Sequence, residues 1–173
     1  AVTEEGDLAF QEYFVHRGCT PKIIGVRFDG VENANPSLPL ATALQSVDSI
    51  VFCPSNPLVS IGPVLAIPSV YDLVERFPGP RIVVSPIVGG HALKGPAAKM
   101  MAELDEEVSC VGIAKRYMGI CDLLVIDEID RDHVSAINML GMRAVVTDTI
   151  MEADQDKDRL AQEIIDLIKG WGS

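Results

Sequence analysis

The stretch SIVFCPSNPLVSIGP (residues 49–63) decides the fold class, because an apolar strand runs directly into a loop without charge. Residues 49–53 are a short β-branched and aromatic run, typical of a buried strand in a parallel sheet. Residues 54–63 carry serine, asparagine and proline but no charged side chain. Because ligands of open α/β sheets bind beyond the carboxyl ends of the strands, this loop suggests a ligand in front of it.

Further apolar runs predict more strands of the same sheet. An alternating run predicts another strand upstream. The predicted strands lie at Lys22–Phe28, Ser49–Cys53, Arg81–Ser85, Leu123–Asp127 and Arg143–Thr147. Short strands that alternate with helices form mostly parallel sheets with right-handed crossovers. We therefore predict one α/β domain over residues 1–173, with a doubly wound, Rossmann-like sheet that is incomplete at its N-terminal side.

Helical patterns separate these strands. The clearest runs from Asp154 to Lys169, with an apolar stripe and acidic residues near its positive N-terminal end. Pro68 divides the apolar segment 62–77 into two short helices. Other helices are predicted at 40–47 with Ser37 as N-cap, 95–104 and 131–140, while 108–113 fits a strand or a helix start and 10–15 fits either type.

Composition excludes several classes of protein. The 173 residues suffice for one core, which is aliphatic because aromatic residues make up only 5%. A net charge of −11 argues against broad nucleic-acid binding. No apolar run reaches the length of a membrane span and no signal sequence is recognisable, so we expect a cytoplasmic protein.

Cysteine and histidine spacing indicates no metal or catalytic site. The cysteines lack zinc-knuckle spacing, and we predict that they are reduced and pack as small apolar residues. One of them ends the predicted buried strand at 49–53. The histidines are scattered, without triad or metal-ligand spacing. These residues are Cys19, Cys53, Cys110 and Cys121, with His16, His91 and His133.

Two successive loops offer matching hydrogen-bond donors for an anion. Each follows a strand, contains small polar residues and glycine, and enters a helix whose first N–H groups favour anions. We interpret them as a double cradle for phosphate or diphosphate. The first loop supplies Ser55, Asn56, Ser60 and Gly62, the second supplies Ser85, Gly89 and Gly90, and Lys94 and Lys99 add positive charge. The structural alternative is that the serines and Asn56 cap helices and turns, and that the lysines are solvated.

Acidic residues also follow two predicted strands. Asp127 and Asp148 each close a strand and fit Mg²⁺ or a ribose, so their roles stay open. For Asp130 we favour the structural alternative, a cap of the helix that follows.

The two loops carry a resemblance to a known family. Pro54–Pro63 and Val84–Met100 closely resemble the two signature blocks of the 2-phospho-L-lactate transferases of coenzyme F-420 biosynthesis. Phe10–Val15, Asp122–Asp130 and Asp148–Met151 are similar to shorter family blocks, in the same order. The resemblance covers nearly the whole chain.

The resemblance implies a reaction and its partners. A 2-phospholactyl or phosphoenolpyruvyl group passes from a guanosine diphosphate-linked donor to the ribityl hydroxyl of 7,8-didemethyl-8-hydroxy-5-deazariboflavin, and GMP leaves. It also implies Mg²⁺ and a homodimer. The loop residues above would hold the nucleotide, Lys94 and Lys99 would be auxiliary, and neither a catalytic base nor a metal ligand is assigned. The sequence does not decide which three-carbon group is transferred.

The chain departs from the family pattern in two ways. Complete members begin with a strand, a Gly-rich loop and an Asn/Asp-rich stretch upstream of the Phe10–Val15 block. We therefore expect this chain to be the C-terminal portion of such a transferase, with much of the acceptor pocket and metal site in the upstream half. Asp105 stands where the family pattern has glycine, at the end of a predicted helix. The alternative function is a non-catalytic nucleotide-binding regulator of the same fold.

Overall fold

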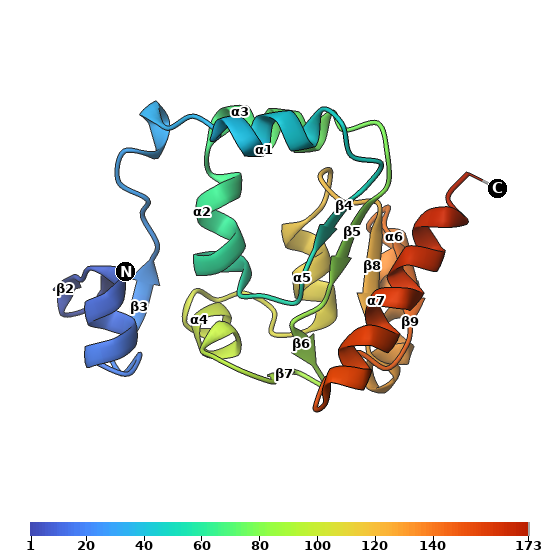
Figure 1. Cartoon of the computed structure of the whole chain (residues 1–173). Helices are drawn as coiled ribbons and strands as arrows, with labels where there is room; N and C mark the ends of the chain where they lie inside the picture. The colour runs from blue at the N-terminus through green and yellow to red at the C-terminus, as the bar shows by residue number, and fades with distance from the viewer. Residues whose placement is uncertain (173) are drawn as a thin grey trace.

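A four-stranded parallel sheet forms the centre of the computed structural model, which describes residues 1–172 (Figure 1). Its spatial order is β4-β5-β8-β9, and each neighbouring pair is parallel. The strands are β4 (Ile50–Phe52), β5 (Arg81–Val84), β8 (Leu123–Ile126) and β9 (Arg143–Val146). All four lie inside the strands predicted from the apolar runs, so the predicted α/β class is confirmed.

Helices cover both faces of this sheet. The connecting helices α3 (Pro68–Glu75), α5 (Cys110–Arg116) and α6 (Val134–Met139) pack on one face, whose strand residues include Val83 and Leu124. The last helix, α7 (Asp154–Lys169), packs Leu160 and Ile164 on the opposite face. Alternate strand residues point to opposite faces, which explains the two separate apolar clusters.

Strand order increases steadily across the described sheet. Successive right-handed crossovers that add strands in one direction place their helices on the same face. Residues 1–172 therefore contain no reversal of strand order, although helices lie on both faces. β4 is an edge strand here, and this explains one wrong prediction: Cys53, which follows it, is exposed rather than buried. Cys19, Cys110 and Cys121 are buried free thiols, as predicted.

The N-terminal segment forms a small antiparallel sheet beside α4 (Figure 1). The predicted strand at 22–28 is shorter in the structure and pairs within this small sheet. Its strands are β1 (Val2–Thr3), β2 (Gly6–Asp7) and β3 (Ile23–Gly25), and Glu12–His16 forms one π-helical turn, η1. Tyr13 and Ile23 are fully buried in the main core, so this segment packs on the α/β unit.

Short helices and one hairpin complete the fold. Pro68 begins α3 and Ser37 caps α1, as the sequence predicts. The remaining elements are η2 (Val31–Asn33), α1 (Leu38–Leu44), η3 (Pro57–Ile61), α2 (Gly62–Leu65), β6 (Ile87–Val88), β7 (His91–Ala92), α4 (Ala97–Glu103) and η4 (Glu128–His133). The β6–β7 hairpin replaces the simple loop expected over residues 86–90, and η4 occupies the start of the helix expected over 131–140.

An ion pair joins the amino ends of β5 and β8. Arg81 Nη2 lies 2.6 Å from Asp122 Oδ1, and the backbone N–H of Arg81 donates to Asp122 Oδ2 at 3.0 Å. Burial of Asp122 opposes its charge, but the hydrogen bonds from Arg81 prevail and hold its pKa below the usual value. The charged side chains at this edge of the sheet therefore neutralise each other and link the two strands.

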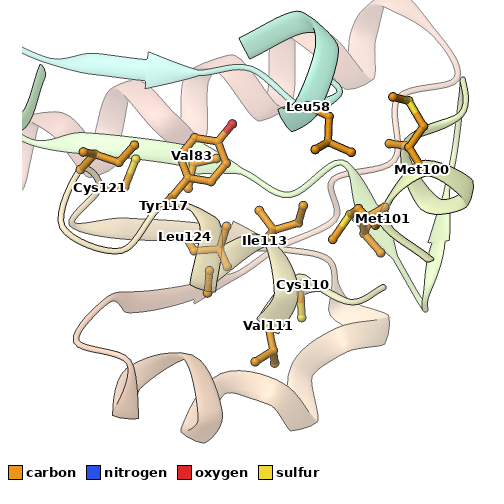
Figure 2. Packing of buried hydrophobic residues seen from close by; sticks show 14 of the residues in the cluster. Leu58, Val83, Met100, Met101, Cys110, Val111, Ile113, Tyr117, Cys121 and Leu124 are labelled. Carbon is orange, nitrogen blue, oxygen red and sulfur yellow. The ribbon is translucent and has the colours of Figure 1, made fainter. Parts of the chain in front are cut away.

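Apolar side chains from several elements fill the main core between α5 and the sheet. Figure 2 shows Val83 and Leu124 of the sheet near Tyr117 and Ile113, with Met100 and Met101 of α4 at the far end. Among residues 1–172, no single helix is long and apolar enough to cross a membrane. Within these residues, one pair of helical segments, Pro57–Leu65 and Pro68–Glu75, is long and apolar enough when the two are counted together. The two segments are bent by 91° relative to each other.

Candidate functional site at the carboxyl edge of the sheet

A cavity of about 460 Å³ lies beyond the carboxyl ends of β4, β5 and β9. Its walls come from the loops after these strands, the start of α4 and the N-terminal segment. The lining residues are Phe10, Phe14, Pro54, Ser55, Asn56, Val59, Ser60, Ser85, Pro86, Leu93, Lys94, Gly95, Pro96, Ala97, Thr149 and Met151. This is the edge at which the loops were predicted to bind a ligand.

Two serines of the first loop line the cavity with hydroxyls that are free of protein partners among the described residues. Ser55 and Ser60 line it, and within residues 1–172 neither hydroxyl donates to a protein acceptor. Asn56 also lines the cavity, but its Oδ1 accepts the N–H groups of Leu58 and Val59 at 2.9 and 3.3 Å. Asn56 therefore shapes the loop as the cap of η3, as the structural alternative expected.

Gly62 does not line this cavity. A Cβ at this position would lie 2.9 Å from the carbonyl oxygen of Pro57 and 3.4 Å from the Phe28 ring. Glycine is therefore required at position 62 by the close packing of α2 on the preceding turn.

The second loop turns its polar groups inward. The Ser85 hydroxyl, 2% exposed, donates to the carbonyl of Ile87 at 2.7 Å and accepts the Ile87 N–H at 3.2 Å. Gly89 and Gly90 form the two-residue turn of the β6–β7 hairpin, with φ of 56° and 79°. Two positive φ angles in such a turn favour glycine strongly.

Neither hairpin glycine lines the cavity. The Gly89 N–H donates to both carboxylate oxygens of Asp130, at 3.2 and 3.1 Å. It is therefore already satisfied by protein. Ser85 does line the cavity wall, although its hydroxyl is engaged.

The two lysines that follow the hairpin lie in different places. Lys94 lines the cavity, and no carboxylate within residues 1–172 lies within 4 Å of its ammonium group. Lys99 lies in the first turn of α4, does not line the cavity and pairs with Glu103. Of the two predicted auxiliary cations, only Lys94 is placed to attract an anion in the cavity.

Asp127 is used as structural support. It is 3% exposed, and its Oδ1 accepts the N–H of Ile129 at 3.1 Å, which makes it the cap of η4 in place of Asp130. Its Oδ2 accepts the N–H and hydroxyl of Thr149 at 2.9 and 3.1 Å. Asp127 thereby fixes the Thr149 wall of the cavity.

Asp148 is also engaged outside the cavity. Its Oδ1 accepts the N–H of Ile150 at 3.0 Å, and its Oδ2 lies 3.0 Å from Arg159.

An apolar rim was not predicted from the sequence as part of the site. The rings of Phe10 and Phe14 stack with centroids 5.3 Å apart and planes 13° apart. Both rings are about 40% exposed, and Leu93 and Met151 line the same cavity. The sequence signals for this rim are the i, i+4 spacing of the two phenylalanines and the place of all four residues in stretches that resemble family blocks.

The lining combines one cation, two free hydroxyls and an apolar rim. Among the lining residues, Lys94 is the only charged one, although the chain as a whole carries a net charge of −11. The absence of a carboxylate removes repulsion of an anion from these walls. Such a cavity suits an anion that is attached to an apolar or aromatic group.

Comparison with known proteins identifies the family. The family model described as 2-phospho-L-lactate transferase CofD matches residues 1–168. The chain is 38% identical over 170 residues to the 2-phospho-L-lactate transferase of Methanopyrus kandleri, covering 96% of this chain and 53% of that protein. It is 30% identical over 171 residues to the phosphoenolpyruvate transferase of Streptomyces griseus, covering 96% and 54%.

The fold is also seen in solved structures. The crystal structure of protein BH3568 from Bacillus halodurans has a TM-score of 0.59 at 16% identity, covering 95% of this chain and 57% of that one. The chain spans about half the length of the curated relatives it matches. Because the family model matches almost the whole chain, the chain belongs to the 2-phospho-L-lactate transferase CofD family.

Proposed function

We propose that the protein takes part in transferring a 2-phospholactyl or phosphoenolpyruvyl group from a guanosine diphosphate-linked donor to the ribityl hydroxyl of 7,8-didemethyl-8-hydroxy-5-deazariboflavin. The hydroxyl oxygen forms a bond to the phosphorus that carries the three-carbon group, the bond from this phosphorus to GMP breaks, and the hydroxyl proton is lost. Relatives named for both the 2-phospholactate and the phosphoenolpyruvate reactions support the transfer class.

The observation that carries the proposal is the cavity with Lys94 as its one charged lining residue. The diphosphate of the donor would pair with Lys94 and accept hydrogen bonds from Ser55 and Ser60. Charge-assisted hydrogen bonds of this kind are the strong ones. Phosphoryl transfer depends mainly on positioning and charge stabilisation, which these groups supply.

Resemblance to the family implies that the reaction requires Mg²⁺. The residues that line this cavity are not suited to bind the ion directly. Mg²⁺ prefers oxygen ligands, usually one or two carboxylates together with substrate phosphates. The described lining contains no carboxylate, and Asp127 and Asp148 are engaged by backbone N–H groups. We therefore assign no Mg²⁺ ligand to these residues and derive no step through the ion.

We also propose, from family membership, a homodimer that works in the cytoplasm. Sedimentation equilibrium at two protein concentrations tests the dimer, and a monomer at both would contradict it.

Calorimetric titration of GDP, with UDP as control and with or without Mg²⁺, tests the nucleotide site. We expect saturable GDP binding that is weakened in Ser55→Ala/Ser60→Ala, two substitutions that leave the Asn56 cap intact. UDP preferred over GDP would favour the non-catalytic regulator. No binding by the folded protein would contradict this cavity as a nucleotide site.

A further inference from the structure

A second cluster of polar side chains lies outside the cavity, where η4 packs against α5. The sulfur of Cys110, a carboxylate oxygen of Asp130 and a ring nitrogen of His133 lie within 4.8 Å of one another. Cys110 and Asp130 are 0% and 4% exposed, and His133 reaches solvent. Two of the three side chains are therefore buried, and the third lies where an ion could enter from solvent.

Local geometry explains why these residues meet. A 3₁₀ helix has three residues per turn, so Asp130 and His133, three apart within η4, lie on one face. Cys110 is the first residue of α5, whose start is fixed by the Ser109 hydroxyl accepting the Gly112 N–H at 3.0 Å. Figure 2 shows Cys110 near Val111 and Ile113, and all three belong to the main apolar cluster.

Sulfur, imidazole nitrogen and carboxylate oxygen together are the ligand set of thiophilic metals. Mg²⁺ prefers oxygen alone, whereas Zn²⁺ binds all three ligand types. Tetrahedral bond lengths place such ligand atoms about 3.4 to 3.6 Å apart, which small side-chain rotations from the present spacing would reach. We propose that Cys110, Asp130 and His133 bind a thiophilic divalent d-block ion such as Zn²⁺, with water in the fourth position.

The surroundings of Asp130 support this assignment. Both of its oxygens already accept the Gly89 N–H, a contact that orients the carboxylate as outer-shell partners orient metal ligands. No Lys or Arg side chain within residues 1–172 pairs with Asp130, so a cation would neutralise a buried charge. The ion would join α5, η4 and the β6–β7 hairpin.

Metal binding has a defined proton balance. Burial, with a further contribution from Asp130, raises the pKa of the Cys110 thiol to about 12, so the thiol is protonated without metal. The ion binds the thiolate and the neutral imidazole, and the Cys110 proton passes to solvent.

Cobalt titration of the protein tests the site, because Co²⁺ replaces Zn²⁺ and thiolate bound to Co²⁺ absorbs in the near ultraviolet. We expect one equivalent of Co²⁺ to produce this band, Zn²⁺ to abolish it and excess Mg²⁺ to leave it unchanged. Cys110→Ser should remove the band, and His133→Gln should weaken Co²⁺ binding about 100-fold. The matched control, Cys53→Ser, removes an exposed thiol and should leave the band intact.

Three results would overturn the proposal. They are no thiolate band in the folded wild-type protein, a band that survives in Cys110→Ser, and a band lost in Cys53→Ser. If Cys110→Ser does not fold, the accessible His133→Gln decides, and unchanged Co²⁺ affinity in that variant would contradict the site. Circular dichroism of each variant establishes folding independently of metal.

Discussion

The loop after β4 and the loop after β5 differ in where their polar groups point. The first leaves the hydroxyls of Ser55 and Ser60 free at the cavity. The second closes its own hydrogen bonds through Ser85 and holds Gly89 against Asp130. Similar composition thus serves two purposes: one loop is open to a ligand, and the other positions the wall that carries Lys94. Changes in the first should affect binding, and changes in the second should affect stability.

The largest expected effect comes from removing the glycines of the hairpin turn. Gly89→Ala/Gly90→Ala places side chains at φ of 56° and 79°, which should cost about 2 to 4 kcal/mol of unfolding free energy. The Gly89 Cβ would also lie 3.3 Å from the Ile129 side chain. Urea denaturation measures this loss. Unchanged stability would show that the hairpin is not the support described here.

The next effect separates the two lysines. Lys94→Ala should weaken GDP binding about 10- to 100-fold, because a hydrogen bond to a charged group contributes about 1.5 to 3 kcal/mol. Lys99→Ala is the matched control, since Lys99 pairs with Glu103 outside the cavity. Calorimetry on both variants checks this expectation. Equal losses would mean that general surface charge, and not the cavity, attracts the nucleotide.

Ser85→Ala sharpens the contrast between the loops. Its hydroxyl is buried and bonded to Ile87, so its removal leaves a buried N–H unpaired and should cost about 1 to 2 kcal/mol of stability. GDP affinity should stay within about twofold of wild type. Thermal unfolding and GDP titration measure the two quantities, and a large affinity loss with unchanged stability would reverse the assignment.

The smallest effect lies at the far end of α4, away from both loops. Asp105 has φ of 57°, and the N–H groups of Glu106 and Asp105 bond to Met101 and Ala102, which is the Schellman arrangement. Asp105→Gly should stabilise the protein by about 0.5 to 1 kcal/mol. Urea denaturation measures the gain, with GDP affinity as control. A loss of stability would contradict the left-handed backbone at this position.

Much of the sheet could be predicted from the sequence, because four short apolar runs between helical patterns allow few other arrangements. The helix 154–169 was predicted to the residue, since its apolar stripe and flanking signals agree. The N-terminal sheet was missed because its first two strands have two residues each. Cys53 was predicted to be buried, but it follows an edge strand within the described residues.

The lining of the cavity was predicted in part. Ser55, Asn56, Ser60, Ser85 and Lys94 do line one cavity, because the carboxyl ends of parallel strands meet at one edge. Gly62, Gly89, Gly90 and Lys99 do not line it. Their roles depend on partners that are distant in sequence, such as Asp130, which lies 41 residues beyond Gly89. Composition reveals which groups can donate a hydrogen bond, but not which are already bonded.

The most direct test compares GDP affinity in one variant of each loop. Calorimetric titration should give a dissociation constant at least about 100-fold higher for Ser55→Ala/Ser60→Ala than for wild type, because two hydrogen bonds to the charged diphosphate are lost. For Gly89→Ala/Gly90→Ala, measured at a temperature where it is folded, the constant should lie within about twofold of wild type. The reverse pattern, with affinity lost only in the hairpin variant, would contradict the account.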